Sequence, residues 1–305
     1  DLAIDPRGGD IVQLTLPAYP RRQDRPEIPF QLFDNGGERL YLAQSGLIGS
    51  NAPDKSSGRA LWSSAQQQYQ LADGQDELVV ELKYSEAGVN YIKRFSFKRG
   101  QYELAVAYRI DNQSAQAWSG NMFAQLKRDS SGDPSSTPAT GTATYLGAAM
   151  WTSEEPYKKV SMSDMDKQAD KETVQGGWVA WLQHYFVTAW VPNKDSTNLV
   201  QTRKDSQGNY IVGFTGPSIQ VAAGAQGETG AILYAGPKLQ EHLGTLSPGL
   251  ELTVDYGFLW FLAQPIFWLL EVIHGVLGNW GWSIIFLTII IKLIFFPLSA
   301  ASYRS

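Results

Sequence analysis

The sequence has no cysteine among its 305 residues. A chain without thiols forms no disulfide and offers no thiolate to a metal ion, so disulfide-stapled domains and thiolate zinc sites are both excluded. The absence of cysteine does not exclude an oxidising compartment, because many bacterial envelope proteins also lack disulfides.

Histidine is scarce as well, with His184, His242 and His274 as its three examples. None has a partner at metal-ligand spacing, and His184 is expected to be an ordinary strand residue. The chain contains no phosphate-binding loop, nucleophile elbow or dinucleotide fingerprint. The formal net charge of −5 lacks the basic surplus of a nucleic-acid-binding protein. We therefore predict no catalytic residue, no metal, no cofactor, no enzymatic activity and no nucleic-acid partner.

Short strands dominate the first 235 residues. Alternation of period two and runs of β-branched or aromatic residues recur there, with turn signals between them. The clearest strand runs are 77–84, 89–111 (two strands around Arg99-Gly100), 178–192, 209–216, 218–224 and 230–237. Many short strands at this spacing predict a mainly β fold, a sandwich of two sheets, rather than a parallel α/β fold.

Other segments of this region lack the strand pattern. The composition of residues 129–141 predicts a loop, and the charged segment 161–175 is expected to be exposed. Residues 238–246 favour a short helix. The following stretch, 249–257, fits either a linker or a last strand.

Residues 258–280 are almost entirely apolar, and their few polar or small residues recur at helical spacing. The stripe consists of Gln264, Glu271, His274, Gly275 and Gly278. At about 100° per residue these positions share one side of a helix, which is typical of a helix lying in a membrane interface. Pro265 either excludes an uninterrupted helix before it or kinks one.

Residues 280–298 form the most apolar segment, and they contain one formal charge, Lys292. Nineteen helical residues span about 28 Å, close to the hydrocarbon thickness of a bilayer, so we predict a membrane-spanning helix. Four tryptophans where the apolar region begins fit a membrane–water interface: Trp260, Trp268, Trp280 and Trp282. Lys292 either snorkels to the far interface or faces a wet cavity within the membrane, and the helix alone does not decide between the two.

Flanking charge predicts an orientation. Arg304 follows the spanning helix, whereas Glu251 and Asp255 precede the interfacial segment, so the C-terminal end is expected in the cytoplasm and the β domain outside. The chain starts with Asp1 and shows no signal peptide, which favours a piece of a longer protein. The predicted order is a β-sandwich domain at 1–250, a linker and interfacial amphipathic helix at 251–279, a transmembrane helix at 280–300, and a cytoplasmic start at 301–305.

Several motifs in this order resemble the YidC/Oxa/Alb family of membrane protein insertases. The resemblance runs along nearly the whole chain, including "RGGDIVQLTLPAYP" (7–20), "PFQLFDNGGERLYLAQSGLIG" (29–49), "FSFKRGQYELAVAYRIDN" (95–112) and "GGWVAWLQHYFVTAWVP" (176–192). Its most specific stretch is "LELTVDYGFLWFLAQPIFWLLEVIHGVLGNWGWSI" (250–284).

The resemblance implies a periplasmic β-supersandwich of the mutarotase-like kind, an interfacial helix and the family's second transmembrane helix. In the family this helix carries a cation, usually arginine, in a groove open to lipid and cytoplasm. Lys292 stands at the matching position, five residues before Pro297, and Thr288 and Pro297 become candidates for lining the groove. The interfacial candidates are Gln264, Glu271 and His274. Lysine keeps the charge but lacks the bidentate fork of arginine.

The function that the resemblance implies is that of an insertase and chaperone for inner-membrane proteins, acting alone or with the Sec translocon. Its expected partners are nascent membrane proteins, the Sec translocon including SecDF, the lipid bilayer and, through regions outside this chain, the ribosome. Such a protein is expected to be multi-pass in the bacterial inner membrane, with residues 1–250 in the periplasm. The alternatives are a membrane-anchored carbohydrate-binding domain and a sensor domain of the cell envelope.

Overall fold

The computed structural model describes the chain except for residues 23, 137–144, 255–259 and 305. Side chains are described for all the remaining positions apart from 260–262, 264 and 297–304. Two compact units emerge, unit 1 (Asp1–Thr253) and unit 2 (Val254–Ser305).

The first antiparallel sheet of unit 1 has eight strands within the described residues. They are β1 (Leu2–Asp5), β2 (Asp10–Arg22), β3 (Arg25–Phe33), β4 (Tyr41–Ile48), β9 (Trp118–Arg128), β12 (Asp170–Gln175), β15 (Thr197–Lys204) and β16 (Tyr210–Val221). The order across the sheet is β1-β2-β4-β9-β16-β15-β12, and β3 pairs with β2.

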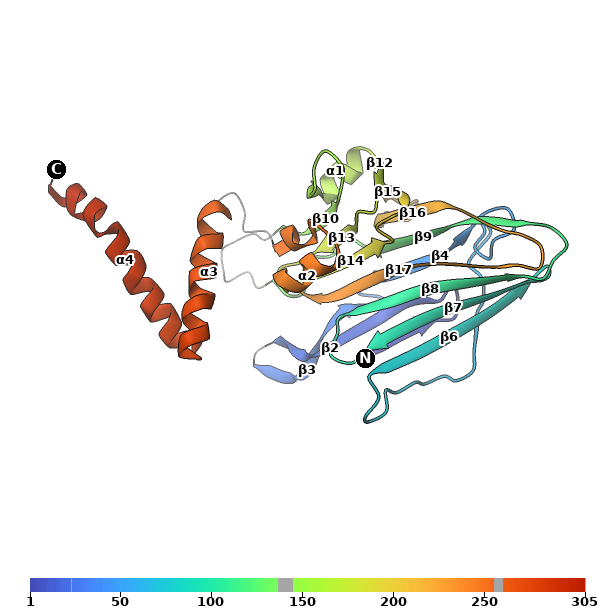
Figure 1. Ribbon diagram of the computed structural model, residues 1–305, viewed down its shortest axis with the longest axis horizontal. Helices are drawn as coiled ribbons and strands as arrows, with labels where there is room; N and C mark the ends of the chain where they lie inside the picture. Colours follow the sequence, from blue (N-terminus) through green and yellow to red (C-terminus); the bar gives the residue numbers. More distant parts are fainter. Residues whose placement is uncertain (23, 137–144, 255–259, 305) are drawn as a thin grey trace. The chain divides into compact units, whose positions relative to one another are not determined.

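The second antiparallel sheet has nine described strands in the order β11-β10-β13-β14-β17-β8-β7-β6-β5. They are β5 (Ser63–Ser64), β6 (Glu77–Glu86), β7 (Val89–Lys98), β8 (Glu103–Asn112), β10 (Gly147–Met150), β11 (Lys158–Val160), β13 (Val179–Leu182), β14 (Phe186–Pro192) and β17 (Gln226–Pro237). The two sheets face each other, and strands of both contribute to one buried core (Figure 1). The predicted mainly β sandwich is confirmed.

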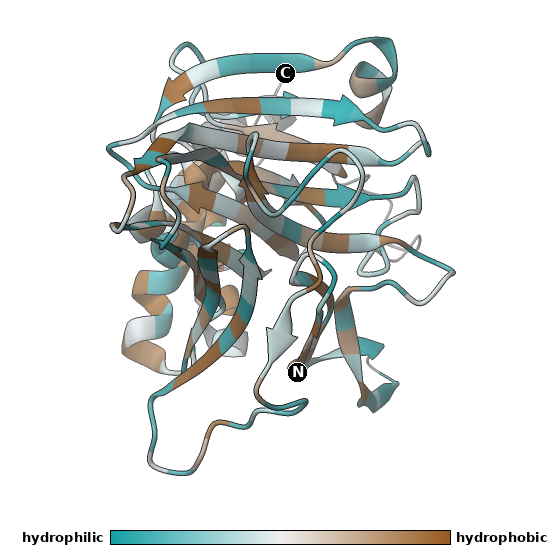
Figure 2. Cartoon of the chain, turned by 90° about the vertical axis from the view of Figure 1, so that its right-hand side faces the viewer, coloured by the Kyte–Doolittle hydropathy of each residue, from teal (hydrophilic) through white to brown (hydrophobic). Residues whose placement is uncertain are grey.

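Strand alternation builds this core. Along β9 every second side chain is buried, which places Trp118, Met122 and Leu126 between the sheets. The same alternation appears as changing hydropathy along the strands in Figure 2. Burying each large apolar side chain stabilises a fold by about 1.5–3 kcal/mol, so the inward positions dominate the energetics of the sandwich.

The run 178–192 is a hairpin and not one strand. β13 and β14 pair antiparallel, with Val179 opposite Trp190. Both strands are buried along their whole length, and the turn between them contains neither glycine nor proline to mark it in the sequence. Asp133 fixes this turn, because its carboxylate accepts from the His184 backbone N–H at 2.5 Å and from the Gln183 amide at 3.1 Å. The expected position of His184 within a strand is therefore wrong.

The predicted strands 209–216 and 218–224 form one strand, β16, with a bulge. Thr215 lies opposite Phe123 and Ser218 opposite Asn121, so two residues of β16 face one of β9. Pro217 has no N–H to donate to a ladder, and a bulge accommodates that gap. The Asn121 side-chain amide donates to the Gly216 carbonyl at 2.9 Å and stabilises the irregularity.

Short elements complete unit 1. The charged segment 161–175 holds α1 (Met162–Lys167), which Ser161 caps, and the strand β12. The predicted helix at 238–246 is present as α2 (Gln240–Leu246). It is followed by the 3-10 helix η2 (Leu250–Val254), so the alternative of a last strand there is wrong. Of the predicted loop 129–141, residues 129–136 belong to no helix or strand, and 137–141 lie outside the described residues.

Unit 2 contains two helices, α3 (Trp260–Leu277) and α4 (Trp280–Arg304), within its described residues. Pro265 lies inside α3, so it does not exclude a helix at residues 260–264. No helix among the described residues combines the length and apolar character that crossing a membrane requires. The predicted helix at 280–300 is thus present as α4, but its span of a membrane is not confirmed, and the domain limits stay predictions.

A buried lysine ties the two sheets together. Lys93 on β7 is 0% exposed, and its Nζ donates to the carbonyls of Gly8 and Ser45, both at 3.0 Å. Ser45 belongs to β4 in the opposite sheet, and Gly8 precedes β2. Burial lowers the pKa of Lys93 to about 7.

Arg59 and two carboxylates surround this lysine. The Arg59 guanidinium bonds Asp54 at 2.7 Å and Asp10 at 2.9 Å. It also donates to the same Gly8 and Ser45 carbonyls, at 3.1 and 2.7 Å. These carbonyls therefore keep a donor even when the lysine amine is removed. We call Lys93, Arg59, Asp10 and Asp54 the inter-sheet cluster.

We predict that Lys93→Met changes the pH dependence of stability. Because the folded state has the lower pKa, the unfolded chain binds more protons between pH 7 and 10.5, and wild-type stability rises with pH across that window. The slope from this one group is at most about 1.4 kcal/mol per pH unit. Urea unfolding in mild detergent, followed by tryptophan fluorescence at pH 7, 8 and 9, measures it.

The variant is expected to lose that slope, since methionine does not titrate. Lys83→Met on the exposed side of β6 is the matched control and should keep the wild-type profile. Parallel profiles for wild type and Lys93→Met would contradict the assignment.

Candidate functional site

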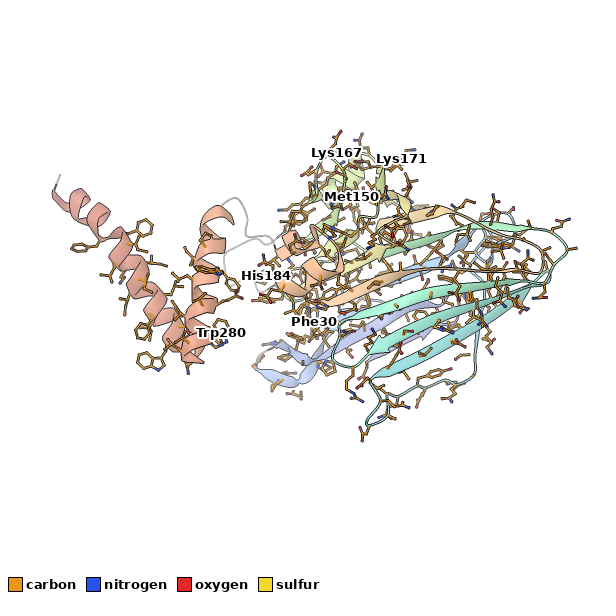
Figure 3. The ribbon with its side chains drawn as sticks, viewed as in Figure 1. Phe30, Met150, Lys167, Lys171, His184 and Trp280 are labelled. Carbon is orange, nitrogen blue, oxygen red and sulfur yellow. The ribbon has the colours of Figure 1, made fainter. Side chains whose placement is uncertain are left out.

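A tight turn joins α3 to α4. Gly278 ends α3 with φ of 63°, a left-handed conformation that favours glycine, and its N–H donates to the His274 carbonyl at 2.7 Å. Asn279 caps α4, because its side-chain oxygen accepts from the Trp282 N–H at 3.2 Å. The His274 ring stacks on Trp280 at 3.7 Å, and Trp280 lies at the turn in Figure 3. The sequence Gly278-Asn279 thus sets a helical hairpin.

One side of α4 is covered within this hairpin. Ser283 is 0% and Leu287 8% exposed, and these two residues are four apart on one helical face. The Ser283 hydroxyl donates to the Asn279 carbonyl at 2.8 Å, so its polar group is satisfied inside the helix. The small serine side chain allows α3 and α4 to approach closely.

Lys292 lies on the opposite side of α4. It follows Ser283 by nine residues, or about two and a half helical turns, and it is exposed. Thr288 is one turn earlier on the same side, and its hydroxyl donates to the Ile284 carbonyl at 2.8 Å. The predicted pair Lys292 and Thr288 therefore shares a face directed away from α3.

Large apolar side chains are exposed on both helices of the hairpin. Those exposed on α4 include Trp282, Ile284, Ile285, Phe286, Ile289, Leu293, Ile294, Phe295 and Phe296. On α3 they include Phe267, Trp268, Val272, Val276 and Leu277. A contiguous apolar surface of this size marks a site for lipid or protein contact.

The predicted interfacial residues have different outcomes. Glu271 is exposed and His274 is half-buried on α3. The side chains of Gln264 and Pro297 lie outside the described residues. The structure thus places Lys292 and Thr288 together, and it places Glu271 and His274 on the other helix of the hairpin.

The remaining histidines belong to unit 1 and have structural contacts. His242 bonds Glu103 at 2.8 Å, and His184 packs edge-on against Tyr185 at 4.1 Å. Among the described residues, no group of three or more His, Asp or Glu side chains is arranged to hold a metal ion.

The inter-sheet cluster was missed by sequence reasoning, although β7 carries a signal for it. Positions 89, 91, 93 and 95 alternate inward as Val, Tyr, Lys and Phe, so Lys93 interrupts an apolar face. A pocket of about 640 Å³ adjoins the cluster and is lined by Ile48, Gly49, Ser50, Asp54, Lys55, Ser56, Ser57, Arg59 and Phe123. Asp54 and Arg59 bond each other there, and Lys55 pairs with Glu86 at 2.6 Å, so the charged side chains that line the pocket already have partners.

A match to a protein-family model shows the family to which this chain belongs. Residues 1–269 match the model described as the YidC periplasmic domain. The chain belongs to the YidC family. The match covers all of unit 1 and continues into α3, so it joins the β sandwich to the first helix of the hairpin.

Curated relatives agree. The membrane protein insertase YidC of Ectopseudomonas mendocina (strain ymp) is 81% identical, over 100% of this chain and 56% of that protein. The membrane protein insertase YidC of Pseudomonas entomophila (strain L48) is 76% identical, over 100% of this chain and 54% of that protein. The chain therefore spans about half the length of the curated relatives it matches.

The solved structures that this chain matches include a galactose mutarotase-like protein from Lactobacillus casei ATCC 334. It is 8% identical with a TM-score of 0.49, and the alignment covers 77% of this chain and 96% of that chain. A galactose mutarotase related enzyme from Lactobacillus acidophilus is 8% identical with a TM-score of 0.48, covering 77% and 93% of the two chains.

We predict that Ser283→Leu loosens the hairpin. A larger side chain at this fully covered position overpacks the contact, at a cost of about 1–3 kcal/mol. Hydrogen exchange of the 279–296 backbone in detergent should become faster. Thr288→Leu, on the exposed face, is the matched control and should exchange like the wild type. Equal exchange in both variants would show that the Ser283 side is not a packed face.

Proposed function

We propose that this chain supplies the periplasmic domain and the cation-bearing helix of a membrane protein insertase and chaperone. The observation that carries the proposal is Lys292 on an apolar, exposed face of α4, in a chain of the YidC family. In this view α4 crosses the inner membrane in a multi-pass protein. Lys292 provides a positive charge within the bilayer for polar or acidic parts of a nascent chain.

Energetics support a role for the charge. A lysine at the centre of a membrane helix costs about 2.5–3.5 kcal/mol on insertion scales, so it persists where water or a partner compensates it. The face of Lys292 is directed away from α3, which leaves it free to contribute to a groove with helices outside this chain. An attracted carboxylate crosses less apolar material when the cation sits partway through the bilayer.

The process involves no covalent chemistry and so no enzymatic activity. The proposed substrates are nascent inner-membrane proteins. The proposed partners are the Sec translocon including SecDF, the lipid bilayer and the ribosome, which is contacted by other regions of the protein. Unit 1 lies in the periplasm, and α3 lies along the outer interface with Glu271 directed to water.

We predict that insertion depends on the charge and its face. In the full-length protein Lys292→Arg should sustain insertion of substrates with acidic translocated segments, whereas Lys292→Leu and Lys292→Glu should impair it by about tenfold, the effect of about 1.4 kcal/mol. Depletion of the native insertase, rescue by each variant at matched expression, and protease protection of the substrate measure the effect.

Moving the positive charge to another position on α4 tests whether its face matters. Thr288→Lys combined with Lys292→Leu returns the cation to the same face one turn away and should restore insertion. Phe286→Lys combined with Lys292→Leu places it on another side of α4 and should not. Full rescue by Lys292→Leu alone, for neutral and acidic substrates, would mean that the lysine merely snorkels.

A further inference from the structure

One end of unit 1 brings together the β2–β3 hairpin, the β13–β14 turn and the start of α2 (Figure 1). The Phe186 ring stacks on Phe30 at 4.4 Å and meets Tyr19 edge-on at 5.4 Å, which fixes the hairpin against β14. The Lys238 N–H donates to the Tyr185 carbonyl at 3.0 Å, which joins the turn to the residues preceding α2. Three segments far apart in sequence therefore form one surface.

This surface exposes apolar side chains. Ile28 is 38%, Tyr185 57%, Leu239 44% and Leu252 40% exposed. Unit 1 has eight large hydrophobic residues exposed among its described positions, and these four all belong to this end. Figure 3 shows Phe30 and His184, neighbours of Ile28 and Tyr185 in sequence, at the same end of the sandwich. We call Ile28, Tyr185, Leu239 and Leu252 the end patch.

Arginines border the end patch. Arg21, Arg22 and Arg25 are exposed at the tip of the β2–β3 hairpin, against the carboxylates of Asp24 and Glu27. Arg22 is paired with Asp24 at 2.9 Å, so Arg21 and Arg25 carry the cationic surplus. Guanidinium groups bind phosphate in a bidentate manner, and tyrosine favours the boundary between headgroups and hydrocarbon.

The chain leaves unit 1 from this end. Leu252 lies in η2, directly after α2, and unit 2 begins at Val254. Six peptide units from Val254 to Trp260, where α3 begins, reach at most about 20 Å. If α3 occupies the membrane interface, the exit of unit 1 lies within that distance of the lipid.

We propose that the end patch, with Arg21 and Arg25, rests on the phospholipid headgroups of the outer surface of the bilayer. This inference rests on the proposed function, because it requires unit 2 to be in the membrane. The apolar side chains enter the headgroup layer, and the arginines bind lipid phosphate. The contact orients the β sandwich above the membrane and strengthens the attachment of the chain to the membrane beyond what the helices provide.

Site-specific fluorescence tests the contact in the cysteine-free full chain. Single cysteines at Ile28, Leu239, Ala115 and Ile289 are labelled with an environment-sensitive dye, and the chain is reconstituted in phosphatidylcholine–phosphatidylglycerol nanodiscs. Ala115 is the control for a dye in water. It lies just after Asn112, the last residue of β8, whereas Glu103, the first residue of β8, contacts α2 at the end patch's end of the sandwich. Ile289 on α4 reports whether unit 2 is in lipid.

Lipids brominated near the headgroup should quench the dye at Ile28 and Leu239 about twofold more than at Ala115, and lipids brominated near the ends of their acyl chains should quench the dye at Ile289, about nine residues into α4. Tyr185→Ser, and separately Arg21→Gln with Arg25→Gln, should each reduce that quenching while leaving Ile289 unchanged.

The outcomes separate the two proposals. If Ile289 is quenched but Ile28 and Leu239 match Ala115, the headgroup contact is wrong and the proposed function stands. If Ile289 is also unquenched, the membrane placement of unit 2 fails. A dye response that depends on protein concentration and not on lipid bromination would assign the patch to a second copy of the chain and overturn the lipid contact.

Discussion

The sandwich depends on a buried polar cluster that bonds its two sheets to each other. The Lys93 amine and the Arg59 guanidinium lie beside each other in the sandwich, and a buried polar or charged group is costly unless hydrogen bonds and opposite charges compensate it. Lys93 and Arg59 meet that requirement by bonding the same carbonyls of Gly8 and Ser45. The N-terminal segment, β4 and β7 are thereby held in one arrangement. Apolar packing alone fixes such a register less strictly, because it has no direction.

The two units differ in how much of their apolar surface they bury. Unit 1 encloses its apolar side chains between the sheets, and its strands alternate accordingly. Within its described residues unit 2 has two helices, and on α4 the hairpin covers the face on which Ser283 and Leu287 lie. Its remaining apolar surface requires an external partner, since exposed apolar area is unfavourable in water. The same reasoning gives the end patch significance, because four of the eight large hydrophobic residues exposed among the described positions of unit 1 gather at the end from which the chain passes to unit 2.

Several features were predictable because their signals are local. Period-two alternation identified β6, β7, β8 and β17, and α2 followed from a short polar-apolar pattern. The run 178–192 was misread, since both strands are buried along their whole length and the turn between them contains neither glycine nor proline. The turn is instead fixed by Asp133, about fifty residues away in sequence. Likewise, the bulge in β16 depends on pairing with β9, which a single segment does not reveal.

The sequence by itself determined the class of the chain: a β region followed by apolar helices, membership of the YidC family, and a lone cation at Lys292 in an apolar run. These depend on composition, periodicity and neighbouring residues. The tertiary structure alone decided that Lys93 is buried beside Arg59, that Lys292 faces away from α3, and that Ile28, Tyr185 and Leu239 share one surface. Such facts arise from contacts between segments far apart in sequence, and only the folded chain brings those segments together.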